Sequence, residues 1–345
     1  MNRFECDKTY ERDLTEFNGL ILEKNGVYSP AAEREIMCLA DQGNLVAMKL
    51  TADLIFYKKI LRKKPFAEAF ELYLRSAGIH TEEGGSFSCG KASYPLSFWI
   101  IGYYLVNYKR ESFLKNCETI GIIEGMSDTL RLRTALSLAA SCIRYVDSPG
   151  ALNLIGRILY EAARNAETFY ELAPAISQCL DTACDSREAC SALSEVYFER
   201  AAKEGYVYAA NNLAAKEADR ILSFSEESAQ TGELSEAIDK YLRLLRLSAD
   251  KYEPYAANRL GLFYANGEIR NESTRKVFRE YVDFSLAKTY FLKATKYPDA
   301  NSAWAYFNLI KYFHRDYDKN LELLNEHMDY IRMLNPKIYD LAMEL

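Results

Sequence analysis

Residues 85–93, GSFSCGKAS, have the glycine and lysine spacing of a loop that binds phosphate. In such a loop a buried strand leads into the glycines, and a helix begins at the lysine so that its first amides face the phosphate. Here residues 67–79 have the periodicity of an amphipathic helix, and Ala92 stands where a metal-binding Ser or Thr is required. We therefore interpret the segment as a glycine-rich loop between helices. A nucleotide-using enzyme acting through Lys91 is the remote alternative.

A second candidate for chemistry is the acidic series Asp316, Asp318 and Asn320, which begins like a calcium-binding loop. That loop requires Gly at its sixth position for a sharp turn, and this chain has Leu321 there. We interpret the series as acidic residues at a helix N-terminus, where the helix dipole favours negative charge.

The cysteines and histidines do not form a recognisable metal or nucleophile motif. Three cysteines lie near one another, at Cys179, Cys184 and Cys190. Their spacings of five and six are wider than those of zinc pairs, so we predict buried structural thiols. The histidines are His80, His314 and His327. None lies beside a Cys or Ser that it could activate, and His80 and His314 are expected to be exposed or at a helix end. We predict no enzyme activity, no metal and no cofactor.

Composition narrows the class of protein. The chain has 345 residues, 49% of them hydrophobic, and a net charge of -6, which argues against binding to a phosphate backbone. The most apolar run, 95–106, is shorter than the ~20 residues that span a membrane. The first residues are charged where a secretory signal would be apolar, and the eight cysteines have no framework spacing. These features predict a cytoplasmic protein that binds neither nucleic acid nor membrane.

Two kinds of helix recur along the chain. One kind has a small residue followed by aromatic or apolar residues three and four positions later, as in 69-AFELYLRSAG-78, 194-SEVYFERAAKEG-205, 237-AIDKYLRLLRL-247 and 285-SLAKTYFLKATKY-297. The other kind is rich in alanine and recurs every 47 residues, as in 209-AANNLA-214, 256-AANRLG-261 and 303-AWAYFN-308. A similar stretch is 47-AMKLTA-52. Spacings of three and four place the small and aromatic residues on one face of a helix.

This pattern resembles the Sel-one-like repeat family, relatives of the tetratricopeptide repeats, with units that read A-x-x-x-L-G and then A-x-x-[WY]-Y-x-[KR]-A-A-x-x-G. The first half is matched by 256-AANRLG-261, and the second by 194-SEVYFERAAKEG-205 with Ser194 in place of Ala. The resemblance is clearest over 44–79 and 187–311. It implies an all-α, right-handed αα-superhelix that serves as a platform for other proteins, with no catalytic residues to carry over.

We predict about seven helical hairpins in a single domain over residues 29–345. Residues 1–28 would form an irregular arm or a capping helix, and residues 337–345 a capping helix at the other end. Between the clear repeats the predicted helix pairs are 94–108 with 111–120, 129–146 with 151–165, and 168–183 with 187–204.

The repeat register selects candidate binding residues. Asn212, Arg259 and Tyr306 occupy equivalent positions 47 residues apart, and Asn211 and Asn258 form a neighbouring column. In solenoids of this kind the first helices line the concave surface, so these side chains would form a polar ladder. Asn and Arg recognise backbone and carboxylate groups, and Arg and Tyr are common interface anchors. A merely solvated face is the alternative.

The insertion 265–283 is the longest connection between paired helices and is a second candidate surface. Insertions in solenoids gather on one face, often the binding face, and this one carries Arg275, Lys276 and Arg279. The alternative is a longer helix end followed by a solvated charged turn.

Our main functional hypothesis is a scaffold that binds an unidentified protein or peptide in its concave groove. The alternative is a sensor that changes its superhelical shape around a small signalling ligand or short peptide.

Overall fold

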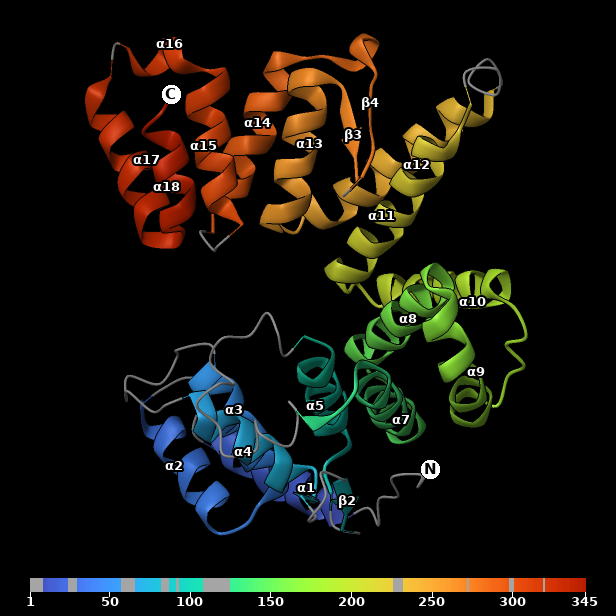
Figure 1. Cartoon of the computed structure of the whole chain (residues 1–345). Helices are drawn as coiled ribbons and strands as arrows, with labels where there is room; N and C mark the ends of the chain where they lie inside the picture. The colour runs from blue at the N-terminus through green and yellow to red at the C-terminus, as the bar shows by residue number, and fades with distance from the viewer. Residues whose placement is uncertain are drawn as a thin grey trace. The chain divides into compact units, whose positions relative to one another are not determined.

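The structure is a computed structural model that describes residues 9–23, 30–56, 66–81, 87–90, 93–107, 125–225, 232–271, 273–297, 301–318 and 320–345. Within these ranges α-helices predominate, together with two short β-hairpins and one 3-10 helix (Figure 1). The prediction of a predominantly α-helical fold is confirmed. The chain forms two compact units, Met1–Ala201 and Ala202–Leu345, which are described separately.

The first unit contains α1 (Thr9–Glu23), α2 (Pro30–Asp41), α3 (Leu45–Phe56), α4 (Phe66–Ser76), α5 (Pro95–Asn107), α7 (Asp128–Tyr145), α8 (Pro149–Arg164), α9 (Ala166–Leu180) and most of α10 (Arg187–Lys203). Helix α3 packs against α4, α5 against α7, and α7 against both α8 and α9. The predicted second partner of α5, residues 111–120, lies outside the described residues. Among the described helices, α5 packs most extensively against α7 and also contacts α4 and α8.

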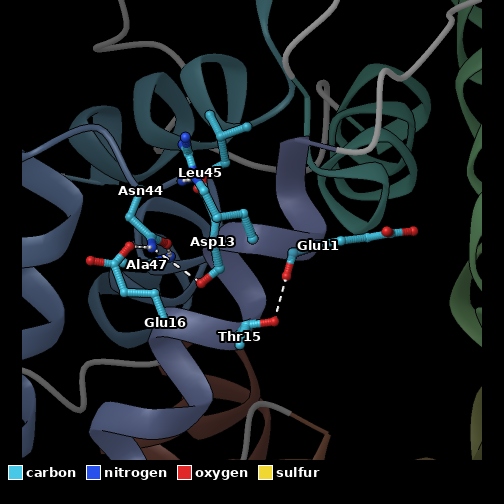
Figure 2. Close-up of polar contacts among 8 residues, drawn as sticks. Glu11, Asp13, Thr15, Glu16, Asn44, Leu45 and Ala47 are labelled. Atoms are coloured by element: carbon cyan, nitrogen blue, oxygen red, sulfur yellow. Dashed lines mark hydrogen bonds and ion pairs between the residues drawn. The ribbon is translucent and has the colours of Figure 1, made fainter.

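Helix α1 is fastened to the start of α3 by buried polar groups (Figure 2). The Asp13 carboxylate accepts a hydrogen bond from the backbone amide of Leu45 at 2.9 Å. The Asn44 side chain donates to the Asp13 carbonyl and to Glu16, and it accepts from the amide of Ala47. Because the first amides of a helix have no partner within the helix, α1 satisfies part of the N-terminus of α3. Over 9–23 the N-terminal segment is therefore a docked helix.

The first β-hairpin follows α4 and consists of β1 (Ile79–Thr81) and β2 (Phe87–Cys89), with Ile79 opposite Cys89. The amide of Gly90 donates to the carbonyl of Gly78 at 2.7 Å and extends the pairing. Part of the predicted glycine-rich loop is thus a hairpin. Gly85 and Lys91 lie outside the described residues.

The second unit contains α11 (Val207–Ser223), α12 (Gly232–Ala249), α13 (Pro254–Asn266), β3 (Glu268–Arg270), β4 (Arg275–Val277), the 3-10 helix η3 (Arg279–Tyr281), α14 (Phe284–Thr295), α15 (Ser302–Tyr312), α16 (His314–Tyr317), α17 (Leu321–Leu334) and α18 (Pro336–Ala342). Helix α11 packs against α12, α13 against α14, and α15 against α17. Successive pairs are joined because α12 also packs against α13, and α14 against α15.

Two helices begin with a capping side chain followed by a proline. Ser148 caps α8 by accepting from the amide of Ala151, and Pro149 occupies the first turn. Glu253 caps α13 by accepting from two amides, with Pro254 as the next residue. Proline is well placed there because its missing N–H would have no partner in the first turn.

The insertion 265–283 is not a longer helix end. It forms the antiparallel hairpin β3–β4, with Ile269 opposite Lys276, followed by η3. Ile269 is fully buried. The hairpin packs against α13 and against α11, the first helix of the preceding pair (Figure 1). On β3 the central residue is buried and its two neighbours are not, which is the period-two pattern of a strand. Three residues are too few for this pattern to be told from a charged turn in the sequence.

Glycine allows close approach within the helix pairs. A Cβ at Gly261 of α13 would lie 2.5 Å from Cδ1 of Phe291 in α14. A Cβ at Gly156 of α8 would lie 2.7 Å from Cδ1 of Phe198 in α10. Both phenylalanines are fully buried, so neither ring has room to move aside. The same contact, a glycine against an aromatic ring, therefore occurs between two helices in each unit.

Candidate partner-binding surface

The alanine-rich helices α11 and α13 position the predicted asparagine column. Their small residues Ala209, Ala210, Ala256 and Ala257 are all buried. Small side chains let neighbouring helices approach closely. The asparagine that follows the two alanines in each helix therefore lies within hydrogen-bonding distance of a later helix. Asn211 and Asn258 are both buried as a result.

Asn211 connects α11 to the start of α13. Its side-chain amide donates to Oε2 of Glu253 at 2.8 Å. The same oxygen accepts from the amide of Ala256 at 2.7 Å, so one carboxylate both caps α13 and holds α11. A buried hydrogen bond to a charged group contributes about 1.5–3 kcal/mol.

Asn258 makes the equivalent connection one helix pair later. Its side-chain oxygen accepts a hydrogen bond from the side-chain amide of Asn308 in α15 at 2.9 Å. Both asparagines of the column are therefore engaged with the following helix pair. Their positions favour a structural role over an open polar ladder.

Arg259 of α13 is half-buried beside the β3–β4 hairpin. It donates to the carbonyl of Arg270 at 2.8 Å and lies near the phenol of Tyr241. Burial raises the pKa of Tyr241, an effect that the charge of Arg259 opposes. Asn212, the equivalent residue of α11, is also half-buried.

The hairpin residues differ in what they contact. Lys276 donates to the carbonyls of Ile221 and Phe224 at the end of α11, at 3.2 and 2.5 Å. Its charge lies where the negative end of the helix dipole favours a cation. Arg275 and Arg279 are exposed. At the hairpin tip, Asn271 donates to Asp219 of α11, which further fastens the hairpin to that helix.

Tyr306 does not continue the polar ladder. It is only 4% exposed, and its ring stacks on Tyr330 at 5.1 Å between centroids. It also lies 4.8 Å from the ring of His327, whose Nδ1 shares a 2.8 Å hydrogen bond with the hydroxyl of Tyr317. Burial raises the pKa of Tyr306 to about 12. The equivalent register position is buried here because α17 packs on α15.

Arg259, Arg275 and Arg279 therefore lie on α13 and on the segment that follows it, Asn212 lies on α11, and Tyr306 is buried between α15 and α17. We call the four residues Asn212, Arg259, Arg275 and Arg279 the hairpin surface. Its groups are hydrogen-bond donors and positive charges, which suit non-covalent recognition of carboxylates and backbone carbonyls.

One pairing escaped the sequence interpretation. Residues 168–183 were expected to pair with 187–204, yet α9 packs on α7 and α8, and Phe198 of α10 lies against Gly156 of α8. Arg187 of α10 also donates to the carbonyls of Ala163 and Arg164 at the end of α8. The signal was present in 151-ALNLIG-156, which has the same small-to-glycine spacing as 256-AANRLG-261. The intervening helix α9 obscured it.

The residues considered for chemistry are placed as follows. Cys184 and Cys190 are buried, Cys179 is half-buried, and burial raises the pKa of Cys190. His80 is exposed on β1, and His314 is the exposed first residue of α16. Asp316 forms an ion pair with Lys288 at 2.7 Å.

The described residues contain no group of His, Cys, Asp or Glu side chains that could hold a metal ion. Over the same part of the chain, every helix is too short or too polar to cross a membrane.

No family model and no curated protein sequence matches the chain. One solved structure that is similar is described as "Crystal structure of c5321: a protective antigen present in uropathogenic Escherichia coli strains displaying an SLR fold". The alignment has 13% identity and a TM-score of 0.26, and it covers 89% of this chain. The chain spans 65% of the length of that protein. A similarity this loose carries no argument about fold or function.

Proposed function

We propose that this chain is a Sel-one-like helical-repeat protein that binds another protein or a peptide and has no catalytic activity of its own. The observation that carries the proposal is the recurrence of one packing unit, in which Gly156 lies against Phe198 and Gly261 against Phe291. Repeat proteins stack such units so that each contacts its neighbours, and they use the extended surface to bind partners. About seven hairpins in one right-handed superhelix remain part of this proposal.

The hairpin surface is our candidate for partner contact. Arg275 and Arg279 are exposed, and the half-buried Arg259 donates to the carbonyl of Arg270 on the same hairpin. Arginine is enriched in the energetically dominant positions of protein interfaces, where its planar group binds carboxylates through paired hydrogen bonds. Asn211, Asn258 and Lys276 support this surface by holding α11, α13 and the hairpin together.

A cytoplasmic location is also part of the proposal. Cys142, Cys184 and Cys190 are buried cysteines that form no disulfide. Unpaired buried thiols are typical of proteins that fold in a reducing compartment.

The test is affinity capture with three baits, the wild type and two doubly substituted variants, read by quantitative mass spectrometry. Arg275→Glu with Arg279→Glu alters the hairpin surface. Arg315→Glu with Lys337→Glu makes the same change of charge at exposed positions elsewhere in the unit. A protein retained by the wild type and the control, and lost from the hairpin variant, supports the proposal.

Equal retention by all three baits would exclude the hairpin surface. If no bait retains a protein, the scaffold function is wrong and the small-ligand sensor becomes the better hypothesis. Circular dichroism of each bait confirms that the variants are folded.

A further inference from the structure

The turns that join one helix pair to the next carry an unusual density of tyrosine. These turns follow α10, α12 and α14 and precede α11, α13 and α15. Their tyrosines are Tyr206, Tyr208, Tyr252, Tyr255 and Tyr297. Three are substantially exposed, with Tyr208 at 53%, Tyr255 at 42% and Tyr297 at 61%. Because paired helices return to the same end, these turns form one edge of the second unit (Figure 1). We call it the tyrosine edge.

Lysines connect the turns of this edge. Lys251 donates to the carbonyl of Gly205 at 2.9 Å, which joins the first turn to the second. Lys293 forms an ion pair with Asp250 at 2.7 Å, and Lys296 lies 4.0 Å above the ring of Tyr252, which joins the second turn to the third. The edge is therefore continuous across all three turns.

The edge is locally basic in an acidic protein. Lys203, Lys251, Lys293 and Lys296 lie on it, together with the exposed carboxylates Glu204 and Asp250. Glu253 is buried, and its oxygens are engaged by Asn211 and the start of α13. Among the described residues of these turns the lysines therefore outnumber the exposed acids, and Asp299 of the third turn lies outside the described residues. The whole chain carries a net charge of -6. Local charge of the opposite sign favours an anionic partner at this edge.

The backbone at Tyr252 is held in a left-handed conformation, with φ at 59°. The equivalent position 47 residues earlier is Gly205, with φ at 81°. Glycine adopts this conformation freely, whereas another residue is destabilised by roughly 1 kcal/mol. The ring of Tyr252 is thereby placed against Tyr297 at 5.4 Å and under Lys296. If the turn only had to reverse the chain, glycine would be more stable at this position, as it is at Gly205. The tyrosine side chain at 252 therefore indicates a further role.

The chemistry of the edge separates two classes of anionic partner. Tyrosine hydroxyls and lysine ammonium groups donate hydrogen bonds to carboxylates as well as to phosphates. Bases of single-stranded nucleic acid need an open aromatic face on which to stack. Here Tyr252 and Tyr297 meet edge to face at 88°, and Lys296 covers the face of Tyr252. The edge therefore suits carboxylates better than stacked bases.

We propose that the tyrosine edge binds an acidic, Glu- or Asp-rich segment of a protein partner. The carboxylates of this segment would contact Lys296 and the exposed side chains of Tyr255 and Tyr297. This surface is separate in residues from the hairpin surface. The inference shares with the proposed function only the premise that the partner is a protein.

The test measures fluorescence anisotropy with a labelled Glu-rich peptide and a matched peptide in which each Glu is replaced by Gln. We expect the wild type to bind the Glu peptide and not the Gln peptide, with affinity falling as salt is raised. Lys296→Glu with Tyr297→Ala should weaken binding about tenfold or more. Lys337→Glu, an exposed lysine on α18, and the hairpin variant should bind as the wild type does.

A further variant, Tyr252→Gly, separates a binding role from a structural one. Glycine suits the left-handed turn, so we expect this variant to unfold near the wild-type temperature and to bind the Glu peptide more weakly. The proposal is overturned if Tyr252→Gly binds the Glu peptide with wild-type affinity. It is also overturned if Lys337→Glu weakens binding as much as Lys296→Glu with Tyr297→Ala does. The absence of binding to the Glu peptide, or tighter binding to an oligouridylate of similar length, overturns it as well.

If the wild type does not bind the Glu peptide but still captures a protein that the hairpin variant loses, the tyrosine edge is wrong and the proposed function is retained. Loss of capture in the hairpin variant with Glu-peptide binding intact would show that the two surfaces are independent.

Discussion

At the scale of single residues, the absence of a side chain is as informative as its presence. Gly261 has no Cβ, and its place is taken by the ring of Phe291, which is fully buried and stacked on Tyr312. The ring is therefore confined from both sides. Any residue larger than glycine at 261 must displace it.

We predict that Gly261→Ala lowers the free energy of unfolding by about 1–2 kcal/mol. Overpacking a filled core costs roughly 1–3 kcal/mol, and the gain in helix propensity offsets part of it. Denaturant unfolding measures the change. The control is Gly232→Ala, because a Cβ at Gly232 would meet nothing within 4 Å. A loss in the control as large as at Gly261 would refute the packing argument.

His327 is a residue for which burial predicts a dependence on pH. Burial lowers its pKa below the ordinary value of 6.5, against the opposing effect of Glu326. Below about pH 6.5 the unfolded chain therefore takes up a proton at this position before the native state does. Stability contributed by the neutral ring is present above that pH and is lost as the pH falls.

Thermal unfolding measured from about pH 7.5 to about pH 5 should show this loss in the wild type. The decrease should be smaller in His327→Gln, which keeps a hydrogen-bonding group near Tyr317 and cannot titrate. The same slope in both proteins would mean that another group governs the effect.

At the scale of elements, the β3–β4 hairpin is a brace between helix pairs. Lys276 on β4 binds the carbonyls of Ile221 and Phe224, so an insertion after α13 completes the C-terminus of α11. The last carbonyls of a helix lack partners within it, which explains why a distant lysine stabilises this end.

We predict that Lys276→Met destabilises the second unit by about 1–2 kcal/mol, since it removes a charged donor from the helix end. Hydrogen exchange should rise at the C-terminal turn of α11. Arg275→Met is the matched control, because Arg275 is the exposed neighbour on the same strand. Unchanged exchange at the end of α11 would contradict the brace.

At the scale of the whole molecule, the question is whether the two compact units unfold together. The sequence predicted one domain over residues 29–345, and that remains a prediction. In repeat proteins, stability arises from each repeat and from its contacts with the neighbouring repeats. A destabilising substitution therefore affects mainly the repeat that carries it and the repeats next to it. A substitution at Gly156, which lies against Phe198, would destabilise the first unit locally.

Gly156→Ala should raise hydrogen exchange in α8 and α10 and leave the protection of α13, α14 and α15 unchanged. The physical reason is that a local overpacking lowers the free energy of the nearby opening first. Hydrogen exchange read by mass spectrometry gives the protection of each helix. A uniform loss of protection in both units would show that the chain unfolds as one cooperative body.

Much of the local structure was predictable from the order of residues. The spacing of small and aromatic residues indicated the helices, and a capping residue followed by proline stands at the start of α8 and of α13. These signals are readable because helix periodicity and capping depend on residues within a turn or two of each other.

The candidate site depended on tertiary structure for the opposite reason. Asn258 and Tyr306 were predicted to face a partner, but Asn308 and Tyr330, which come from later helices, bury them. The contact of Gly156 on α8 with Phe198 on α10 skips α9, and the β3–β4 hairpin packs against the earlier helix α11. Register shows which residues are equivalent. Whether an equivalent residue is open or covered is decided by side chains brought to it from elsewhere in the chain.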